Sequence, residues 1–136
     1  MTGLDFSKIV ARLRDFAFPE VDLVVGVESG GIVPASLVAL RLGRPAAFIS
    51  INYRDTANRP QHERPVLLKP AASIQASGRV LLVDDVSVTG QTLALAREVI
   101  GVQDVSTFVL KGRADHVLFP ELTECVEWPW NKLKKG

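Results

Sequence analysis

The segment "LLVDDVSVTGQT" (residues 81–92) passes from an apolar run through two adjacent acids into a turn rich in hydroxyl groups. The apolar run reads as a strand covered on both faces, expected over residues 79–84. A helix is expected to follow over residues 91–100. Two carboxylates can simply be solvated at a strand end, and the hydroxyl groups can simply cap the helix. The alternative is that acids and turn together form a binding site.

The turn itself has the features of an anion site. The first turn of a helix offers unpaired backbone N–H groups and the positive end of the helix dipole. Gly90 permits close approach of a ligand to the backbone. The six residues of this turn, called the phosphate turn below, are Ser87, Val88, Thr89, Gly90, Gln91 and Thr92.

Asp84 and Asp85 would repel a phosphate unless something lies between them and the ligand. The vicinal hydroxyl groups of a sugar can do so, since carboxylates accept their hydrogen bonds, and so can Mg²⁺. The spacing therefore suits a ribose 5-phosphate. The turn lacks lysine and arginine and does not have the pattern of a Walker A loop.

Elsewhere in the chain, strands alternate with helices. Strands are expected over residues 21–27, 46–53 and 105–110, and "VLLK" (residues 66–69) could be a short returning strand. Helices are expected over residues 7–16, with Ser7 as a cap, and over residues 35–43, closed by Gly43. This order predicts an α/β fold with a parallel, doubly wound sheet, in which ligands sit beyond the carboxyl ends of the strands. The 136 residues fit a single domain, residues 1–136.

Charge, cysteine content and hydropathy argue against several classes of protein and site. The net charge of +1 gives no bias towards nucleic acid or an anionic membrane. Cys125 is the only cysteine, which excludes an intrachain disulfide and argues against a structural zinc site. No apolar run reaches the length of a membrane span, and the first residues do not resemble a signal peptide, so a cytoplasmic protein is expected.

The stretch "VLLVDDVSVTGQT" (residues 80–92) resembles the diphosphate-ribose signature of the type I phosphoribosyltransferases. That signature has four apolar residues, two acids, three variable residues and then Thr-Gly-x-Thr. The resemblance implies the fold of that family, with phosphoribosyl diphosphate bound by Asp84, Asp85 and the phosphate turn. It also implies that both acids are catalytic, stabilising positive charge at the anomeric carbon, and that they hold Mg²⁺ directly or through water and ribose hydroxyls. Both acids must be ionised for this, which a position at the strand end should permit.

A second turn, in "GVESGGIVPA" (residues 26–35), resembles the pyrophosphate loop of the same family. The resemblance implies that the backbone N–H groups of Ser29, Gly30 and Gly31 hold the leaving pyrophosphate. By itself "ESGG" fits a tight turn before a helix equally well. The polar residues 54–65 match the family's long flexible loop, and their arginines, Arg54, Arg59 and Arg64, would meet the pyrophosphate or merely belong to a solvated loop.

The last third of the chain bears on the acceptor. "FVLKGRADHVLFPELTECVEWPW" (residues 108–130) resembles the hood of the 6-oxopurine transferases, which places a small C-terminal hood at about residues 111–130. In those enzymes a lysine at a strand end binds the purine carbonyl, a role that falls to Lys111, although a surface lysine is the simpler alternative. The other base-binding residues implied are Val86, Cys125 and Val126. Trp128 and Trp130 are expected to pack rather than to stack on a base.

Three residues depart from the family pattern. Val88 stands where 6-oxopurine enzymes usually carry an aspartate, Cys125 where an aromatic ring usually stacks, and Ser29 where several members have a basic residue. The resemblance implies transfer of ribose 5-phosphate from phosphoribosyl diphosphate to a base, a 6-oxopurine, with release of pyrophosphate, as in purine salvage. The alternative is a non-catalytic regulatory protein of the same fold that binds phosphoribosyl diphosphate or a nucleotide. A homo-oligomer is expected in either case.

Overall fold

The computed structural model describes residues 2–52, 66–67 and 78–134, so the predicted loop at residues 54–65 lies outside the described residues. The helices are α1 (Phe6–Asp15), α2 (Ile32–Leu42), α3 (Gln91–Ile100) and α4 (Pro129–Lys134). The strands are β1 (Thr2–Gly3), β2 (Leu23–Glu28), β3 (Ala46–Asn52), β4 (Val66–Leu67), β5 (Arg79–Ser87), β6 (Asp104–Gly112), β7 (His116–Val117) and β8 (Val126–Glu127). None of the helices in this part of the chain has both the length and the apolar character needed to span a bilayer.

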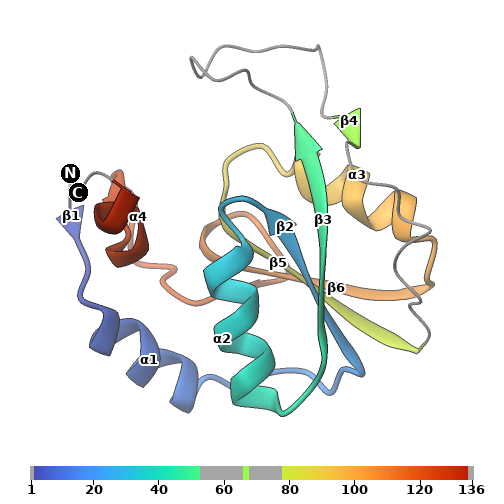
Figure 1. Cartoon of the computed structure of the whole chain (residues 1–136), viewed down its shortest axis with the longest axis horizontal. Coiled ribbons are helices and arrows are strands. Elements are labelled where there is room, and N and C mark those ends of the chain that lie inside the picture. Colours follow the sequence, from blue (N-terminus) through green and yellow to red (C-terminus); the bar gives the residue numbers. More distant parts are fainter. Residues whose placement is uncertain (1, 53–65, 68–77, 135–136) are drawn as a thin grey trace.

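The main sheet has the strand order β4-β3-β2-β5-β6-β7 (Figure 1). The strands from β3 to β7 in this order are parallel, and β4 joins the edge antiparallel to β3. The prediction of a parallel α/β sheet is confirmed. Because parallel strands point the same way, the turns that follow β2 and β5 leave the sheet at the same edge.

Helices cover both faces of this sheet, as predicted. Successive residues of β5 point to opposite faces, so that Leu81 and Val83 pack in one core with α1 and α2, whereas Val80 and Leu82 pack in another with α3. All four side chains are buried. A strand buried on both faces has no polar alternation, which explains the continuous apolar run in the sequence.

The boundaries differ from the predicted ones where tertiary contacts decide them. The helix α1 begins at Phe6 with Asp5 at the cap position, so the prediction of Ser7 as the cap is wrong. Helix α3 has the predicted bounds, and Gly43 closes α2 in the left-handed conformation. Strand β5 runs on to Ser87 because β6 pairs with it over its whole length. The acid pair therefore lies inside the strand and not at its end.

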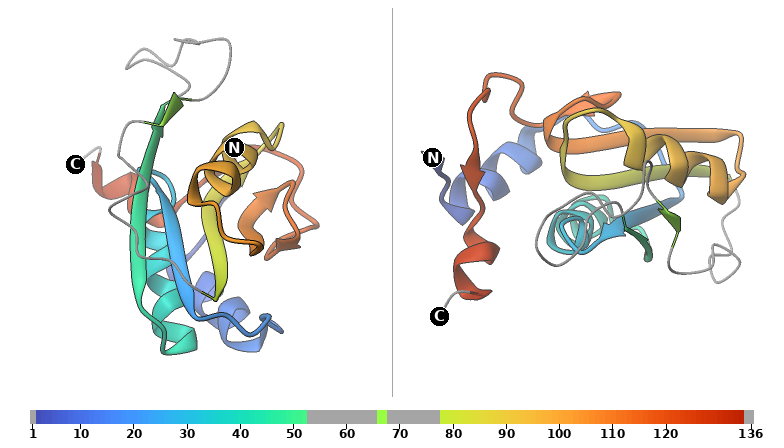
Figure 2. Two further views of the ribbon diagram at one scale, coloured as in Figure 1. Left: turned by 90° about the vertical axis from the view of Figure 1, so that its right-hand side faces the viewer. Right: turned by 90° about the horizontal axis from the view of Figure 1, so that it is seen from above.

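The C-terminal segment folds back beside α1, at one end of the molecule (Figure 2). Its strand β8 pairs in parallel with β1 to form a separate two-stranded sheet. Trp128 and Trp130 are only 2% and 9% exposed, and their rings stack with centroids 5.6 Å apart. Both belong to the core that includes α1 and α2, which confirms that they pack.

Arg12 of α1 forms several contacts that hold the C-terminal segment in place. Its guanidinium donates to the Leu118 carbonyl over 3.0 Å and lies 4.5 Å from the centroid of the Phe119 ring. It also forms an ion pair with Glu121. The Arg12 guanidinium holds the pKa of the Glu121 carboxyl below its usual value, chiefly through their hydrogen bond.

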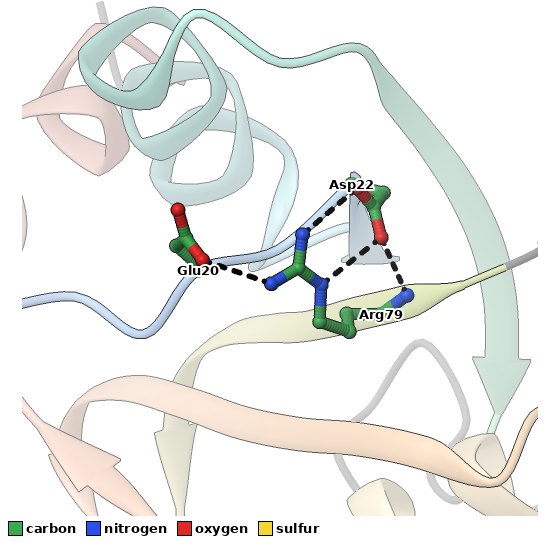
Figure 3. Close-up of polar contacts among 3 residues, drawn as sticks. All are labelled: Glu20, Asp22 and Arg79. Atoms are coloured by element: carbon green, nitrogen blue, oxygen red, sulfur yellow. Dashed lines mark hydrogen bonds and ion pairs between the residues drawn. The ribbon is translucent and has the colours of Figure 1, made fainter.

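A cluster of three charged residues joins the amino ends of β2 and β5, at the opposite edge of the sheet from the two turns (Figure 3). The Arg79 backbone N–H and side chain both donate to the Asp22 carboxylate, over 2.8 Å and 3.2 Å, and a further guanidinium nitrogen donates to Glu20 over 3.1 Å. The hydrogen bonds from Arg79 lower the pKa of Asp22. The cluster fixes the two strands at the end away from the candidate site.

Candidate functional site

The two acids sit where β5 loses one of its neighbours. The pairing of β5 with β2 ends at Val83, whereas its pairing with β6 continues. On the open stretch the side chains accept backbone hydrogen bonds: the Asp85 N–H donates to Asp84 Oδ1 over 2.8 Å, and the Val86 N–H donates to Asp85 Oδ1 over 2.7 Å. Each carboxylate is thus held in place by the backbone of the next residue.

Burial also changes the pKa of Asp84. The pKa of Asp84 is raised well above its usual value of 3.8, first by burial and then by the negative charge of Asp85 and a hydrogen bond with its side chain. This differs from the expectation that both acids ionise freely at an open strand end. The reason is the greater length of β5, which keeps Asp84 within the sheet. A ligand that brings positive charge or hydrogen-bond donors would favour the ionised form.

The phosphate turn surrounds a hollow of about 270 Å³ at the start of α3. Gly90 is the cap residue and has a φ of 85°, a conformation that suits glycine. Residues from β5, the turn and the first part of α3 line the hollow, among them Asp84, Ser87, Val88, Thr89, Thr92 and Leu93. The structure therefore brings Asp84 and most of the predicted phosphate turn together around one space.

Individual side chains of the turn behave differently. Thr89 Oγ1 accepts a hydrogen bond from the Gln91 N–H over 3.2 Å, so this hydroxyl orders the turn locally. Ser87 is buried at the end of β5, whereas Val88 is 76% exposed. The Val88 side chain therefore contributes little hydrophobic stabilisation to the fold. It lines the wall of the hollow.

The turn after β2 reaches the acid pair from the other side. A Cβ atom on Gly30 would lie 2.6 Å from Asp85 Oδ1, and one on Gly31 would lie 2.6 Å from the carbonyl oxygens of Val27 and Val83. Side chains at these two positions are thus excluded by the acid and by the ends of β2 and β5. Ser29 is exposed, and the peptide bond before it is cis. The turn at residues 29–31 therefore lies against Asp85.

The predicted base-binding residues fall into two groups. Lys111 is half-buried near the end of β6 and is the register partner of Val86 on β5, one residue before the phosphate turn. Cys125 is exposed and precedes β8, and Val126 lies in β8, opposite Thr2. Val86 and Val126 pack against the same core. Lys111 and Val86 thus lie on the paired strands β6 and β5, whereas Cys125 and Val126 lie in the C-terminal segment.

Two residues close to the site were not predicted. Leu93 lines the hollow from α3 and is buried. Gly112 is the register partner of Ser87 and follows Lys111 in the chain. No pattern in the sequence marks either residue, since both act through the way in which β6 and α3 pack against β5.

A metal at the acid pair would need ligands beyond those that the described residues supply. The described residues contain no group of three or more histidine, cysteine or acidic side chains that could hold an ion. Mg²⁺ prefers six oxygen ligands and usually takes several from water or a bound phosphate. The adjacent carboxyl groups of Asp84 and Asp85 offer oxygen ligands that fit such shared coordination, because a cation would offset the repulsion that raises the pKa of Asp84.

Comparisons with known proteins agree with this geometry. An orotate phosphoribosyltransferase from Sulfurisphaera tokodaii is 30% identical over 113 residues, which cover 80% of this chain and 51% of that protein. An adenine phosphoribosyltransferase from Chloroflexus aurantiacus is 32% identical over 112 residues, or 72% of this chain and 61% of that protein. The chain thus spans between half and two thirds of the length of these two relatives.

The crystal structure of a purine phosphoribosyltransferase from Pyrococcus horikoshii superposes with a TM-score of 0.71 at 25% identity, over 95% of this chain and 93% of that one. The family model for the phosphoribosyl transferase domain matches residues 6–115, which include the acid pair and both turns. The chain therefore belongs to the phosphoribosyl transferase domain family.

Proposed function

We propose that this protein transfers ribose 5-phosphate from phosphoribosyl diphosphate to a 6-oxopurine base and releases pyrophosphate. One observation carries the proposal: the Asp85 carboxylate lies against Gly30, so the two turns meet at the acid pair. Diphosphate and sugar phosphate of one substrate must be held on either side of a ribose, and this arrangement supplies a surface for each.

In the proposed reaction, the backbone N–H groups of residues 29–31 hold the departing pyrophosphate and the phosphate turn holds the 5-phosphate. Asp84 and Asp85 accept hydrogen bonds from the ribose hydroxyls. As the bond from the anomeric carbon to the diphosphate breaks and the bond to the base nitrogen forms, positive charge develops on the sugar. Negative charge fixed nearby stabilises it. Asp84 must be ionised to contribute, so substrate binding has to lower its pKa from the raised value in the free protein.

Mg²⁺, when bound by Asp84, Asp85 and the substrate, would supply charge neutralisation of the leaving pyrophosphate. The two adjacent carboxyl groups support this assignment, because the charge of Asp85 contributes to the raised pKa of Asp84 and a cation would offset it. A bound cation would also offset the repulsion between the two carboxylates, which gives a reason why the pair can lie in a half-buried strand.

The acceptor is assigned through Lys111. An ammonium group beside Val86 at the end of β6 can donate to a carbonyl oxygen of a base held over the acid pair. The similarity to a solved purine phosphoribosyltransferase supports a purine. The relatives named for orotate and adenine make these two bases the main competitors.

The test has a binding step and a turnover step. Replacing both acids, Asp84→Asn with Asp85→Asn, should abolish binding of phosphoribosyl diphosphate in the presence of Mg²⁺ by calorimetry, with an unchanged circular dichroism spectrum. Asp104→Asn, an exposed acid at the other end of β6, is the matched control and should bind normally. Turnover is then compared for hypoxanthine, guanine, xanthine, adenine and orotate. A preference for adenine or orotate would contradict the assigned acceptor but not the transfer reaction.

A regulatory protein that binds the same ligand without transfer is the second candidate. The exposed, apolar Val88 on the wall of the hollow favours it, because valine can neither give nor take a proton. Tight binding of phosphoribosyl diphosphate with no turnover of any of the five bases would establish this candidate. Turnover of any of them excludes it.

A further inference from the structure

The end of β6 closes directly onto the phosphate turn. The last two residues of β6, Lys111 and Gly112, pair in register with Val86 and Ser87 of β5. Ser87 is also the first residue of the phosphate turn. The strand that carries the proposed base-binding lysine thus ends against the backbone from which the turn departs.

The contact is made by the backbone and leaves no room for a side chain. The N–H of Arg113 donates to the Ser87 carbonyl oxygen over 2.8 Å. A Cβ atom on Gly112 would lie 2.0 Å from that same oxygen and 2.8 Å from the carbonyl carbon. Real Cβ atoms essentially never approach another atom within 3.0 Å, so any other residue must push Ser87 away.

The backbone conformation of Gly112 adds to this requirement. Its φ of 113° lies in a region that residues with a side chain rarely adopt. Gly101, which closes α3, also has a positive φ of 69°, but a Cβ atom there would meet nothing within 4 Å. Gly101 therefore has the conformational requirement alone, whereas Gly112 has the conformational and the steric requirement together.

We infer that Gly112 is a positioning residue for the phosphate turn. Because Gly112 has no side chain, β6 can pair closely with Ser87. This pairing sets the position of the phosphate turn relative to Lys111. The inference rests on the proposed function, because it assumes that the turn binds the phosphate of the sugar. It adds that a displacement of the end of β6 moves the phosphate turn with it, whereas the turn at residues 29–31 keeps its position.

Ligands that occupy one turn each can test this separation. Gly112→Ala should weaken the binding of ribose 5-phosphate by at least about tenfold, since small displacements of a binding group have large effects. The same variant should bind pyrophosphate within about twofold of the unchanged protein, because the Gly30 turn is not displaced. Gly101→Ala should alter neither affinity. Calorimetry with the two ligands measures both constants, and melting temperatures report the general loss of stability in each variant.

Amide hydrogen exchange in the unchanged protein gives a test that does not depend on whether the variant folds. Ribose 5-phosphate should slow exchange of the Arg113 amide, which is bonded to Ser87. The Leu118 amide, bonded to Val109 between β6 and β7, should be unaffected. Equal affinity of Gly112→Ala and the unchanged protein for ribose 5-phosphate would overturn the inference alone. An equal loss of affinity for ribose 5-phosphate and pyrophosphate in this variant would also overturn it. The same holds if ribose 5-phosphate leaves the exchange rate of the Arg113 amide unchanged. An unchanged protein that does not bind ribose 5-phosphate would overturn the proposed function and this inference with it.

Discussion

Asp84, within β5, and Asp22, directly before β2, have opposite electrostatic surroundings. Burial and the charge of Asp85 raise the pKa of Asp84, whereas the hydrogen bonds from Arg79 lower the pKa of Asp22. A raised pKa means that the folded state holds its proton more tightly than the unfolded state. Stability then falls as the pH rises above 3.8 through the higher pKa of the folded state. For Asp22 the sign is reversed, and stability is lost as the pH falls below 3.8.

Amide substitutions should therefore have opposite effects. Asp84→Asn should raise the melting temperature at pH 7, because the asparagine keeps an oxygen acceptor for the Asp85 N–H but carries no charge. Asp22→Asn should lower it, since the ion pair with Arg79 is lost. The difference for Asp84→Asn should shrink as the pH falls through the raised pKa of the folded state towards 3.8. The difference for Asp22→Asn should shrink only as the pH falls below 3.8. Thermal melts between pH 3 and pH 8 in metal-free buffer measure this, and a lower melting temperature for Asp84→Asn at pH 7 would contradict the assigned surroundings.

Lys111 is the residue to which the proposed function assigns the selection of the base. Lys111→Ala should lower the specificity constant for bases that carry the carbonyl by on the order of ten- to a hundredfold, since a buried carbonyl left without a donor costs about 1–3 kcal/mol. Lys111→Met keeps the apolar stem and should have the same effect if the ammonium group is responsible. The dissociation constant of phosphoribosyl diphosphate, measured alongside, should change little. An equal loss for bases with and without the carbonyl would assign Lys111 another role.

At the scale of elements, the site depends on the close approach of two turns that leave neighbouring strands. Gly30→Ala would place a Cβ atom 2.6 Å from the Asp85 carboxylate, so the turn or the acid must move. Such overpacking costs about 1–3 kcal/mol. The affinity for pyrophosphate should fall by on the order of tenfold, measured by calorimetry.

Ser29→Ala is the control for this change. Ser29 is exposed in the same turn, and its replacement keeps the backbone N–H that is proposed to bind pyrophosphate. Its pyrophosphate affinity should match that of the unchanged protein. A strong loss in Ser29→Ala and none in Gly30→Ala would mean that the serine hydroxyl, and not the backbone of the turn, binds the anion.

At the scale of the whole molecule, the two edges of the sheet have different tasks. The Glu20–Asp22–Arg79 cluster fixes β2 and β5 at their amino ends, and the carboxyl ends of the same strands carry the candidate site. Ligand binding at one edge of a single folded unit stabilises the whole of it. Phosphoribosyl diphosphate with Mg²⁺, at one hundred times its dissociation constant, should add about 2.7 kcal/mol. For a chain of this length that is a rise in melting temperature of roughly 5 °C.

The control for this measurement is the variant in which Asp84 and Asp85 are both asparagine. It should melt at the same temperature with and without the ligand, since its binding surface is lost. No shift in the unchanged protein at millimolar ligand would count against transfer and against the regulatory alternative alike.

The class of fold and the positions of the two turns could be predicted from the amino-acid sequence. Continuous apolar strands alternating with helices have few arrangements other than a parallel sheet covered on both faces. Residues 87–92 and 29–31 could be predicted because local composition decides how a turn presents its N–H groups and hydroxyls. The bounds of α3 followed from local signals in the same way.

How these parts contact one another depends on the way the strands pair and pack. The pairing of β6 extends β5 to Ser87 and so draws Asp84 into the sheet, which raises its pKa. The contact of Gly30 with Asp85 and that of Gly112 with Ser87 join residues far apart in the chain. The electric field at a carboxylate and the room left beside a carbonyl depend on neighbours brought by other strands. Local sequence patterns do not specify those neighbours. The two turns could therefore be predicted, whereas the contacts that join them to the acid pair and to β6 could not.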